Sequence, residues 1–424
     1  MRARITVVGI GADGWPGVPA RLRSLVDDAE VVLGGARHLA LLEPRPGQHR
    51  VPWPVPLRAG LPSLLAEHAG RRVVALATGD PLLSGVGTTL VDLLGADAVE
   101  VHPGLSSVAL ARGRLGWSAE SAAVVSLVGR DPALVLRELA PGRRVVALSS
   151  DATTPGALAR LLVRQGYGAS LLAVLGDLGA PTESRLDAAA AAWDAAADAR
   201  VPPLNVVAVD LRGPVVGSWT AGLPDEAYEH DGQLTKRDLR ASALARLAPQ
   251  PGQLLWDLGA GAGSVGVEWM RAHPTCRAVA VEIDPARAAR IARNAAGLGV
   301  PALDVRTGRA QEVVATLPVA LAHPDAVFVG GGATAPGLLD LCRQALADRG
   351  PGSRLVVHGV TLETESLLAR MHADHGGELT RTSVEHAAPI GSFRGWTPAR
   401  AVTQWSWTVP TTTSTSTSTV EEQP

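Results

Sequence analysis

The chain has 424 residues, more than one hydrophobic core usually organises, so two or three domains are expected. Hydrophobic residues make up 46% and charged residues 19%, a balance typical of soluble globular domains rather than disordered chains. The net charge of −2, from 39 basic and 41 acidic residues, argues against a nucleic-acid-binding protein. The two cysteines, Cys276 and Cys342, exclude a disulfide scaffold and a cysteine-rich zinc site.

No apolar run reaches the roughly 18 residues that would indicate a membrane span. Glycines also interrupt the N-terminal region before the apolar part of a signal peptide could form. We therefore expect a cytoplasmic protein without a membrane partner. The 11 histidines show no ligand spacing with acids or cysteines, so we expect no metal site.

Residues 1–211 alternate between short β-branched runs and helical stretches, the pattern of an α/β domain. We expect the strands to form covered parallel sheets. The predicted strands are Ile5–Ile10, Val31–Leu33, Val73–Ala77, Val99–His102, Val124–Val128, Val145–Leu148, Leu171–Leu175 and Val206–Leu211. The predicted helices are Ala20–Ala29, Leu57–His68, Val86–Leu94 and Pro155–Gln165.

Residues 212–232 have no sustained period and contain proline, glycine and acidic residues, so they predict a linker. A second α/β series fills residues 233–409. Its predicted helices are Thr235–Leu247, a helix from Ser264 to about Arg271, Pro285–Leu298 and Glu363–His375. Its predicted strands are Leu254–Leu258, Val279–Ile283, Leu303–Val305, Ala326–Val329 and Arg354–Val357.

The end of the chain reads differently. Thr380–His386 and Ala401–Val409 are alternating runs joined by a Gly/Pro loop, which predicts an antiparallel hairpin that closes the sheet. The tail, residues 410–424, is a low-complexity Thr/Ser segment and is predicted to be disordered.

The strongest local signal is a strand that ends in Asp257 and runs into a glycine-rich turn, Gly259-Ala260-Gly261-Ala262-Gly263, before a helix. Glycines there let a ligand approach the backbone and the free N–H groups of the helix start. Dinucleotide enzymes use similar turns, so a nicotinamide-dependent oxidoreductase is one alternative. Two acids favour S-adenosylmethionine (SAM): Asp257 suits the methionine ammonium and would repel a pyrophosphate, and Glu282 at the next strand end can accept both ribose hydroxyls.

Four segments carry a resemblance: LTKRDLR at 234–240, DLGAGAGSVG at 257–266, VEIDPAR at 281–287 and DAVFVGGG at 325–332. They resemble the precorrin methyltransferase/decarboxylase family of cobalamin biosynthesis, which has the class I (Rossmann-like) SAM-methyltransferase fold. The resemblance implies that SAM is held by Thr235, Gly259–Gly263, Glu282 and Ala310. Where that family commonly has an acid before the alanine, this chain has Arg309.

Three segments of the first half, VVGIGADGWPG at 7–17, ATGDPLLSGVGTTL at 77–90 and HPGLSSVALARGRLGW at 102–117, resemble the tetrapyrrole (corrin/porphyrin) methylase family. That fold has two α/β lobes with SAM between them. The resemblance, closest to the C5-methylating branch, implies SAM contacts at Gly9, Gly11, Gly79, Asp80, Leu82, Ser106 and Ser107. The first loop reads Gly-Ala-Asp-Gly-Trp, which suggests that Asp13 faces the substrate cleft.

Together the two resemblances imply a fusion enzyme that acts on a corrinoid tetrapyrrole, precorrin-6B. The N-terminal domain would methylate C5, and the C-terminal domain would methylate C15 and decarboxylate the C12 acetate. A homo-oligomer is also implied. The substrate carries many carboxylates, so rim arginines should bind it. The candidates are Arg112, Arg114, Arg130, Arg306 and Arg309, with His358 and Glu363 as further candidates for substrate contact.

A nucleic-acid methyltransferase is a second enzymatic alternative. Base-amino methylases place Asn/Asp-Pro-Pro-Tyr/Phe where this chain has Phe328-Val329-Gly330-Gly331-Gly332. Aromatic residues make up only 3% of the chain, which is poor for base stacking. A scaffold with relict SAM folds is a third alternative, and the intact glycine turns in both halves weigh against it. The sequence does not identify the catalytic acid or base.

Overall fold

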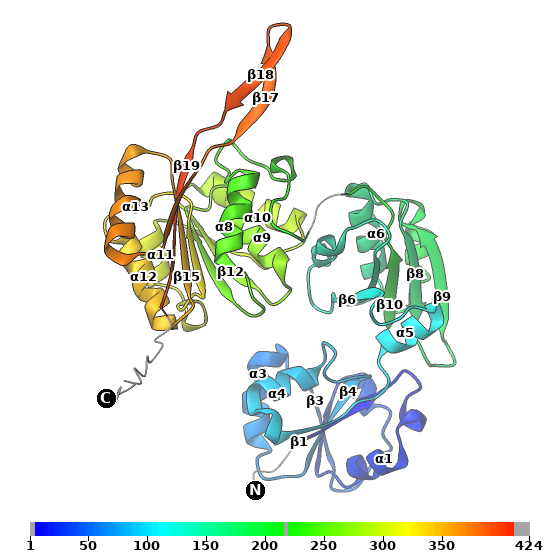
Figure 1. The fold of residues 1–424 in the computed structure, drawn as a ribbon. Helices are drawn as coiled ribbons and strands as arrows, with labels where there is room; N and C mark the ends of the chain where they lie inside the picture. Colours follow the sequence, from blue (N-terminus) through cyan, green and yellow to red (C-terminus); the bar gives the residue numbers. More distant parts are fainter. Residues whose placement is uncertain (1–4, 216–218, 411–424) are drawn as a thin grey trace, which may run out of the picture. The chain divides into compact units, whose positions relative to one another are not determined.

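The computed structural model describes residues 5–215 and 219–410 of the chain. Contacts divide the chain into two compact units, Met1–Val215 and Val216–Pro424 (Figure 1). Each unit is α/β, as the alternation of apolar runs and helical stretches predicted.

The first lobe of the first unit is a five-stranded parallel sheet in the order β3-β2-β4-β1-β5. Its strands are β1 (Ile5–Ile10), β2 (Val31–Gly34), β3 (His49–Pro52), β4 (Val73–Thr78) and β5 (Val99–His102). Its helices are α1 (Ala20–Asp27), α2 (Ala36–Leu39), α3 (Leu57–Glu67) and α4 (Val86–Leu94). Side chains of α1 pack on one face of the sheet, and side chains of α3 and α4 pack on the other.

The second lobe is a mixed sheet in the order β6-β7-β10-β8-β9. Its strands are β6 (Ala122–Ser126), β7 (Arg144–Leu148), β8 (Leu171–Gly176), β9 (Ser184–Ala189) and β10 (Asn205–Asp210). Its helices are α5 (Ser107–Leu115), α6 (Thr154–Arg164) and α7 (Ala195–Asp198). β6 and β7 are parallel, but β10 runs antiparallel to both β7 and β8.

The expectation of parallel strands throughout the first half is therefore wrong for this lobe. An apolar β-branched run shows that both faces of a strand are covered, but it does not show the direction of the strand. β3 and β9 were not predicted; they are two edge strands in which most side chains are exposed or half-buried.

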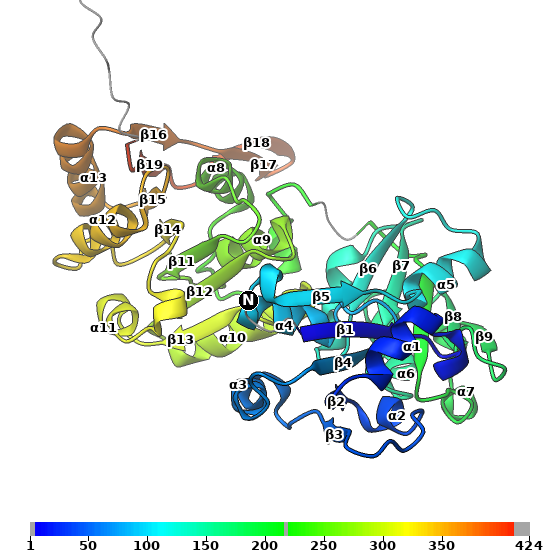
Figure 2. The same ribbon diagram turned by 90° about the horizontal axis from the view of Figure 1, so that it is seen from below.

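The second unit contains a seven-stranded sheet in the order β13-β12-β11-β14-β15-β19-β16 (Figure 2). Its strands are β11 (Leu254–Leu258), β12 (Arg277–Glu282), β13 (Asp304–Thr307), β14 (Ala326–Val329), β15 (Arg354–Gly359), β16 (Glu378–Thr382) and β19 (Val402–Thr408). The five strands from β13 to β15 are parallel, and β19 is antiparallel to both of its neighbours. This is the Rossmann-like sheet with an antiparallel closing pair that the sequence predicted.

Three helices cover each face of this sheet. The helices α8 (Arg237–Leu247), α9 (Ser264–Ala272) and α10 (Pro285–Gly297) contribute to one core, and α11 (Ala310–Ala315), α12 (Leu338–Arg349) and α13 (Leu362–His375) to the other. The division follows from chain order, because the direction of strand addition reverses between β11 and β14, and right-handed crossovers then place the helices that precede the reversal on one face and those that follow it on the other.

The predicted closing hairpin contains an element that the sequence analysis described only as a loop. β17 (Glu385–Ile390) and β18 (Phe393–Pro398) form a separate two-stranded hairpin between β16 and β19. It projects from the second unit (Figure 1). Most of its side chains are exposed on both faces, so its sequence lacks the apolar alternation that predicts a half-buried strand.

Part of the segment expected to be a linker packs on the second unit. Leu223 and Tyr228 are buried in one of its cores, and a short 3-10 helix spans Asp225–Ala227. Glu268 of α9 accepts hydrogen bonds from the Leu223 N–H and the Tyr228 hydroxyl, both at 3.0 Å, and so fixes this segment. Residues 411–424, most of the predicted disordered tail, lie outside the described residues.

Candidate functional sites

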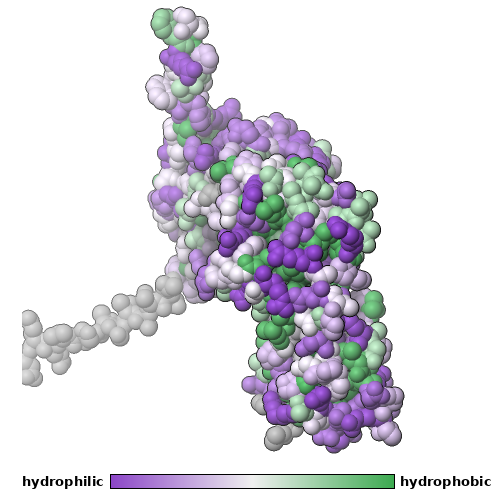
Figure 3. All heavy atoms as spheres, turned by 90° about the vertical axis from the view of Figure 1, so that its right-hand side faces the viewer, coloured by the Kyte–Doolittle hydropathy of each residue, from purple (hydrophilic) through white to green (hydrophobic). Residues whose placement is uncertain are grey.

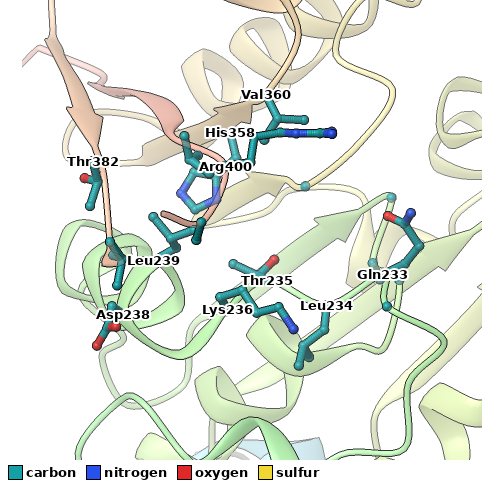
Figure 4. Close-up of a pocket in the computed structure, with 18 of the residues that line it drawn as sticks. Gln233, Leu234, Thr235, Lys236, Asp238, Leu239, His358, Val360, Thr382 and Arg400 are labelled. Carbon is teal, nitrogen blue, oxygen red and sulfur yellow. The ribbon is translucent and has the colours of Figure 1, made fainter. Parts of the chain in front are cut away.

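A cavity of about 370 Å³ opens beside the glycine-rich turn of the second unit. Its wall includes Gly259, Ala260 and Gly261 of the turn and Gly232–Lys236 before α8. Gly330, Val360, Thr382, His386, His358 and Arg400 also line it. Figure 4 shows Thr235 and Lys236 on one side and His358 and Val360 on the other.

The position of this cavity follows from the sheet order. It lies where β11 and β14 end, the point at which the strand order reverses and open α/β sheets bind ligands. Gly259 has a φ of +66°, and a Cβ there would lie 2.7 Å from the carbonyl oxygen of Gly331. The turn after β11 and the glycines after β14 therefore pack backbone to backbone, which leaves main-chain groups to form the cavity wall.

Glu282 ends β12, and only 4% of it is exposed. Its Oε2 accepts a hydrogen bond from the Gly261 N–H at 2.8 Å, and its Oε1 accepts one from the Asp284 N–H at 3.1 Å. Each carboxylate oxygen has a second lone pair, so the carboxylate can accept two further hydroxyl donors. Glu282 itself does not line the cavity, so its contact with a ribose stays a prediction.

Asp257 is 1% exposed and does not line the cavity. Its Oδ2 accepts a hydrogen bond from the Gly266 N–H in the first turn of α9 at 2.9 Å. Within the described residues, its buried Oδ1 has no hydrogen-bond partner. Burial raises the pKa of Asp257 to about 7, and the negative charge of Glu282 adds to the shift. Contact between Asp257 and a methionine ammonium stays a prediction.

The structure brings some of the remaining predicted SAM residues to the cavity and not others. Thr235 lines it. Ala262 is fully buried beneath the turn, and Gly263 packs against Ile291. Ala310 begins α11 without lining the cavity.

The basic side chains on the cavity wall differ from the arginines that the sequence analysis proposed. Lys236 and Arg400 line the cavity and are exposed. Arg306 is paired with Asp304 through two contacts of 2.6 and 2.9 Å and does not line it. Lys236 is the single lysine of the chain and lies in the LTKRDLR segment, so the sequence did contain a feature that could have identified it. No local sequence feature marks Arg400, since only the folding of the chain brings it to the cavity wall.

Two further candidates lie away from the wall. Arg309 precedes α11 and lies 3.9 Å from Glu312, and Glu363 is in the first turn of α13. His358 does line the cavity and is buried.

In the first unit, three glycines meet where neighbouring strands end. A Cβ at Gly9 in β1 would collide with the carbonyl oxygen of Gly79 and the amide nitrogen of Gly104. The Gly104 N–H donates to the Gly79 carbonyl at 2.9 Å. Gly9 is therefore required for the close approach of the loops after β4 and β5, whereas Gly104 was not among the predicted residues.

A smaller cavity, about 60 Å³, lies beside this junction. Residues of the first lobe on its wall are Gly11, Ala12, Thr78, Gly79 and Leu105. Residues contributed from α5 onward are Ser107, Leu110, Leu175, Leu178, Leu204, Asn205 and Val206. The predicted residues Gly11, Gly79 and Ser107 thus share one cavity between the two lobes of this unit.

The other predicted residues of the first unit have local roles. Asp80 Oδ1 accepts a hydrogen bond from the Leu82 N–H at 2.9 Å, which forms a turn in which Leu82 is half exposed. Ser106 caps α5 by accepting the Ala109 N–H at 3.1 Å. The carboxylate of Asp13 folds over Gly17 in its own loop. Their predicted ligand contacts stay predictions.

The arginines proposed for this unit are likewise outside its cavity. Arg114 binds Glu183 through contacts of 2.6 and 3.0 Å. The Arg130 N–H donates to the Leu127 carbonyl and closes a turn. Nε of Arg112 is buried without a hydrogen-bond partner among the described residues. None of them lines the cavity.

A histidine that the sequence analysis did not select supports the same cavity. His38 is buried, and its Nε2 lies 3.3 Å from the Thr78 hydroxyl and 3.1 Å from an Arg37 nitrogen. Burial, together with the charge of Arg37, lowers the pKa of His38 to about 4. Since a guanidinium can only donate, Nε2 is the acceptor nitrogen of a neutral ring beneath the cavity wall.

Among residues 5–215 and 219–410, no three His, Cys, Asp or Glu side chains are grouped as a metal ion would require. No helix in these ranges has the length and apolar character needed to cross a membrane.

Each half of the chain matches a known protein family. Residues 4–192 match the family model of the tetrapyrrole (corrin/porphyrin) methylases, and residues 226–409 match that of the precorrin methyltransferase domain. The chain is 43% identical over 407 residues to a precorrin-6Y C(5,15)-methyltransferase [decarboxylating] from Sinorhizobium sp, covering 95% of this chain and 96% of the relative.

Two shorter relatives match part of the chain. The cobalt-precorrin-7 C(5)-methyltransferase of Salmonella typhimurium is 32% identical, with coverage of 40% of this chain and 83% of the relative. A probable cobalt-precorrin-6B C(15)-methyltransferase (decarboxylating) of Pyrobaculum calidifontis is 38% identical, with coverage of 34% and 73%. On the full-length match, this chain belongs to the family of decarboxylating precorrin-6Y C(5,15)-methyltransferases.

Proposed function

We propose that the chain uses SAM to methylate precorrin-6B, the precorrin-6Y of its relatives' name, at C5 and C15, and that it decarboxylates the C12 acetate to give precorrin-8. The N-terminal unit methylates C5. The C-terminal unit methylates C15 and releases CO₂. The observation that carries this proposal is the presence of two glycine-lined cavities, on two different folds, each at the carboxyl ends of parallel strands.

The glycine turn of the second cavity and the neighbouring Glu282 suit SAM. Backbone groups of Gly259 and Gly261 leave room for a ligand against the turn, and Glu282 has lone pairs for two ribose hydroxyls. SAM supplies a methyl group already activated by its sulfonium. The protein therefore has to align the methyl group with the accepting carbon, and orientation of this kind contributes roughly 7–11 kcal/mol in favourable cases.

The charge on the cavity wall fits a polycarboxylate substrate. Arg400 lines the second cavity and is exposed, so its charge is available to carboxylates that enter from solvent. Lys236 also lines the cavity and is exposed, and its Nζ lies 3.6 Å from Asp225. C15 and the C12 acetate are on neighbouring parts of the macrocycle, so one bound orientation can serve both reactions. C5 is on the other side of the ring, which gives a physical reason for a second active site.

The family decides between the alternatives that the sequence left open. A nucleic-acid methyltransferase and a nicotinamide-dependent oxidoreductase are both disfavoured, because the full-length relative is a precorrin methyltransferase. The residues after β14 agree, since Gly330–Gly332 offer neither the polar group nor the stacking ring of a base-amino methylase.

Two full-length variants test the division of labour. Gly79→Val should block the first site, and the product from precorrin-6B should carry one new methyl group and have lost CO₂. Gly259→Val should block the second site, and no CO₂ should be released. Release of CO₂ by Gly259→Val, or addition of both methyl groups by Gly79→Val, would contradict the assignment of the two reactions.

We also propose that the enzyme is a cytoplasmic homo-oligomer. The hairpin β17–β18 exposes Ile390, Phe393 and Trp396, with 60%, 78% and 71% of each residue accessible. Apolar (green) atoms lie at the tip of the projecting arm in Figure 3. Exposed apolar clusters of this kind mark interaction surfaces, and a second copy of the chain is the partner implied by the family resemblance.

Light scattering tests this assembly. The native chain should have the mass of an oligomer, and Phe393→Glu combined with Trp396→Glu should reduce that mass towards one chain. A native chain that elutes with the mass of a single copy would contradict the proposal.

A further inference from the structure

His358 is held at the end of β15 in a defined orientation. It lines the second cavity, yet only 8% of it is exposed. It pairs with Gln404 in the antiparallel register of β15 and β19, and its Nε2 lies 2.9 Å from Oε1 of Gln404. The rings of His358 and Phe328 pack edge to face, with their centroids 5.0 Å apart and an angle of 84° between the ring planes. The imidazole is therefore fixed by packing and by one hydrogen bond.

The hydrogen bond determines which nitrogen carries the proton. An amide oxygen only accepts, so Nε2 of His358 donates, and Nδ1 of the neutral ring keeps its lone pair. Within residues 5–215 and 219–410, no group hydrogen-bonds to Nδ1, and Nδ1 is not among the buried atoms without a partner. A basic nitrogen on the cavity wall is thus free for a ligand.

The charge environment keeps this ring neutral. Burial is the main cause that lowers the pKa of His358, and the positive charge of Arg246 on α8 adds to it, while the hydrogen bond to Gln404 acts in the opposite direction. The charged or titratable groups that share the cavity wall are Lys236, Asp238, His386 and Arg400. Lys236 and Arg400 carry a positive charge and Asp238 a negative one, and none of them is among the causes that shift the pKa of His358.

The chemistry of the C-terminal unit needs one proton acceptor and one proton donor; this argument rests on the proposed function. At C15 a carbon–carbon bond forms to the methyl group, the sulfur–carbon bond breaks with its electron pair going to sulfur, and the C15 proton leaves. At the C12 acetate the bond to the carboxylate breaks, CO₂ departs, the electron pair passes into the conjugated ring, and the remaining carbon takes a proton. The two steps together consume and release no net proton.

We propose that Nδ1 of His358 is the catalytic base that takes the proton from C15 and returns it to the carbon that loses CO₂. The two acids nearest the glycine turn are less suited. Glu282 already accepts two backbone N–H donors, and Asp257 does not line the cavity. His386, the other histidine of the wall, lies on the exposed hairpin and has no partner to orient it in the described residues. His358 alone among these groups combines a free lone pair, a fixed ring and access to the cavity.

The test uses His358→Gln in the full-length chain, because the glutamine amide can still donate to Gln404 but has no basic nitrogen. Calorimetry should show unchanged SAM binding. Turnover of precorrin-6B to the C15-methylated, decarboxylated product should fall about 100-fold or more, the scale of general acid–base catalysis. The loss should appear in kcat rather than in KM. The matched control is His375→Gln at the end of α13, outside this cavity, which should keep the native rate.

Unchanged SAM binding at the second site shows that the mutated unit is folded, and the other active site is an internal control for the rest of the chain. Supplied with the singly methylated, decarboxylated product made by Gly79→Val, His358→Gln should methylate C5 at the native rate. Native C15 methylation by His358→Gln would overturn the assignment of the base. If the wild-type chain itself fails to methylate precorrin-6B, the proposed function fails instead, so the two failures are distinguishable.

A second measurement needs no turnover. Nitrogen-15 NMR of the ligand-free, histidine-labelled chain, with the His358 signals identified by their loss in His358→Gln, reports the tautomer directly. We expect a protonated Nε2 and an unprotonated Nδ1 at neutral pH. A proton on Nδ1, or a doubly protonated ring, would overturn the proposal whatever the activity of the enzyme.

Discussion

The carboxylate of Glu282 accepts a hydrogen bond from the Gly261 N–H at 2.8 Å, which ties the end of β12 to the glycine turn after β11. The same carboxylate accepts the Asp284 N–H at the start of α10. One buried acid therefore fixes two loops at the edge of the cavity and keeps lone pairs for a ligand.

Replacing Glu282 tests its role as the ribose ligand. Glu282→Ala should weaken SAM binding at the second site about 10–150-fold, because charged hydrogen bonds each contribute about 1.5–3 kcal/mol. Calorimetry on the full-length variant should show one native and one weakened site. Asp340→Ala, an exposed acid of α12, is the control and should bind as the native chain does. Two native sites in Glu282→Ala would remove Glu282 from the binding residues.

The number of SAM sites tests the two-cavity account. The native chain should bind two equivalents, while Gly79→Val and Gly259→Val should each bind one. Gly79 has a φ of +54° and Gly259 one of +66°, so a β-branched side chain is strained at both, and at Gly259 it also collides with Gly331. A native stoichiometry of one would contradict two working sites.

The buried ion pair of the second unit should control its stability. Arg240 has no exposed area, and its Nε lies 2.5 Å from Oε1 of Glu268. Glu268→Gln removes the nearer of the two acids paired with this buried guanidinium and leaves Asp225 at 3.3 Å, so the loss should reach up to about 3–5 kcal/mol, the typical cost of breaking a buried ion pair. Urea denaturation should show this loss in the transition of the second unit, while Glu312→Gln, at an exposed pair, should change it little. An unchanged midpoint for Glu268→Gln would show that the pair is not a determinant of stability.

Asp257 predicts a pH dependence of stability. Burial raises its pKa from 3.8 to about 7, so the folded chain binds a proton there more tightly than the unfolded chain does. Its contribution is therefore fully present below about pH 4 and is lost as the pH rises to about 7, by at most about 1.4 kcal/mol per pH unit.

Asp257→Asn should remove this dependence, since its side-chain oxygen can still accept the Gly266 N–H while no group titrates. Urea denaturation between pH 4 and 8 compares the two chains. Equal slopes of unfolding free energy against pH in both would show that Asp257 does not titrate in this range.

Much of the fold could be predicted from the sequence because its strands are short apolar runs between recognisable breaks. β1, β5, β11 and β14 match their predicted bounds. β9 and the hairpin β17–β18 could not be predicted, since exposed strands lack the period that burial imposes. The direction of β10 depends on long-range pairing, which no local pattern records.

The residues of the second site likewise divide into those that local motifs predicted and those that only the fold brings together. Motifs predicted the turn Gly259–Gly261 and Thr235, both of which line the cavity. Arg400 and Gln404 become part of the site only because β19 returns beside β15, so their roles follow from topology. Arg306 and Arg114 were selected by position, but each is already paired with an acid close to it in the structure.

Mass spectrometry of the products formed by the full-length chain from precorrin-6B and methyl-labelled SAM tests the central claim most directly. The account predicts a final corrinoid with two labelled methyl groups and one CO₂ lost, formed through an intermediate with one label that is already decarboxylated. A final product with only one label, or with both labels and the C12 acetate intact, would contradict it.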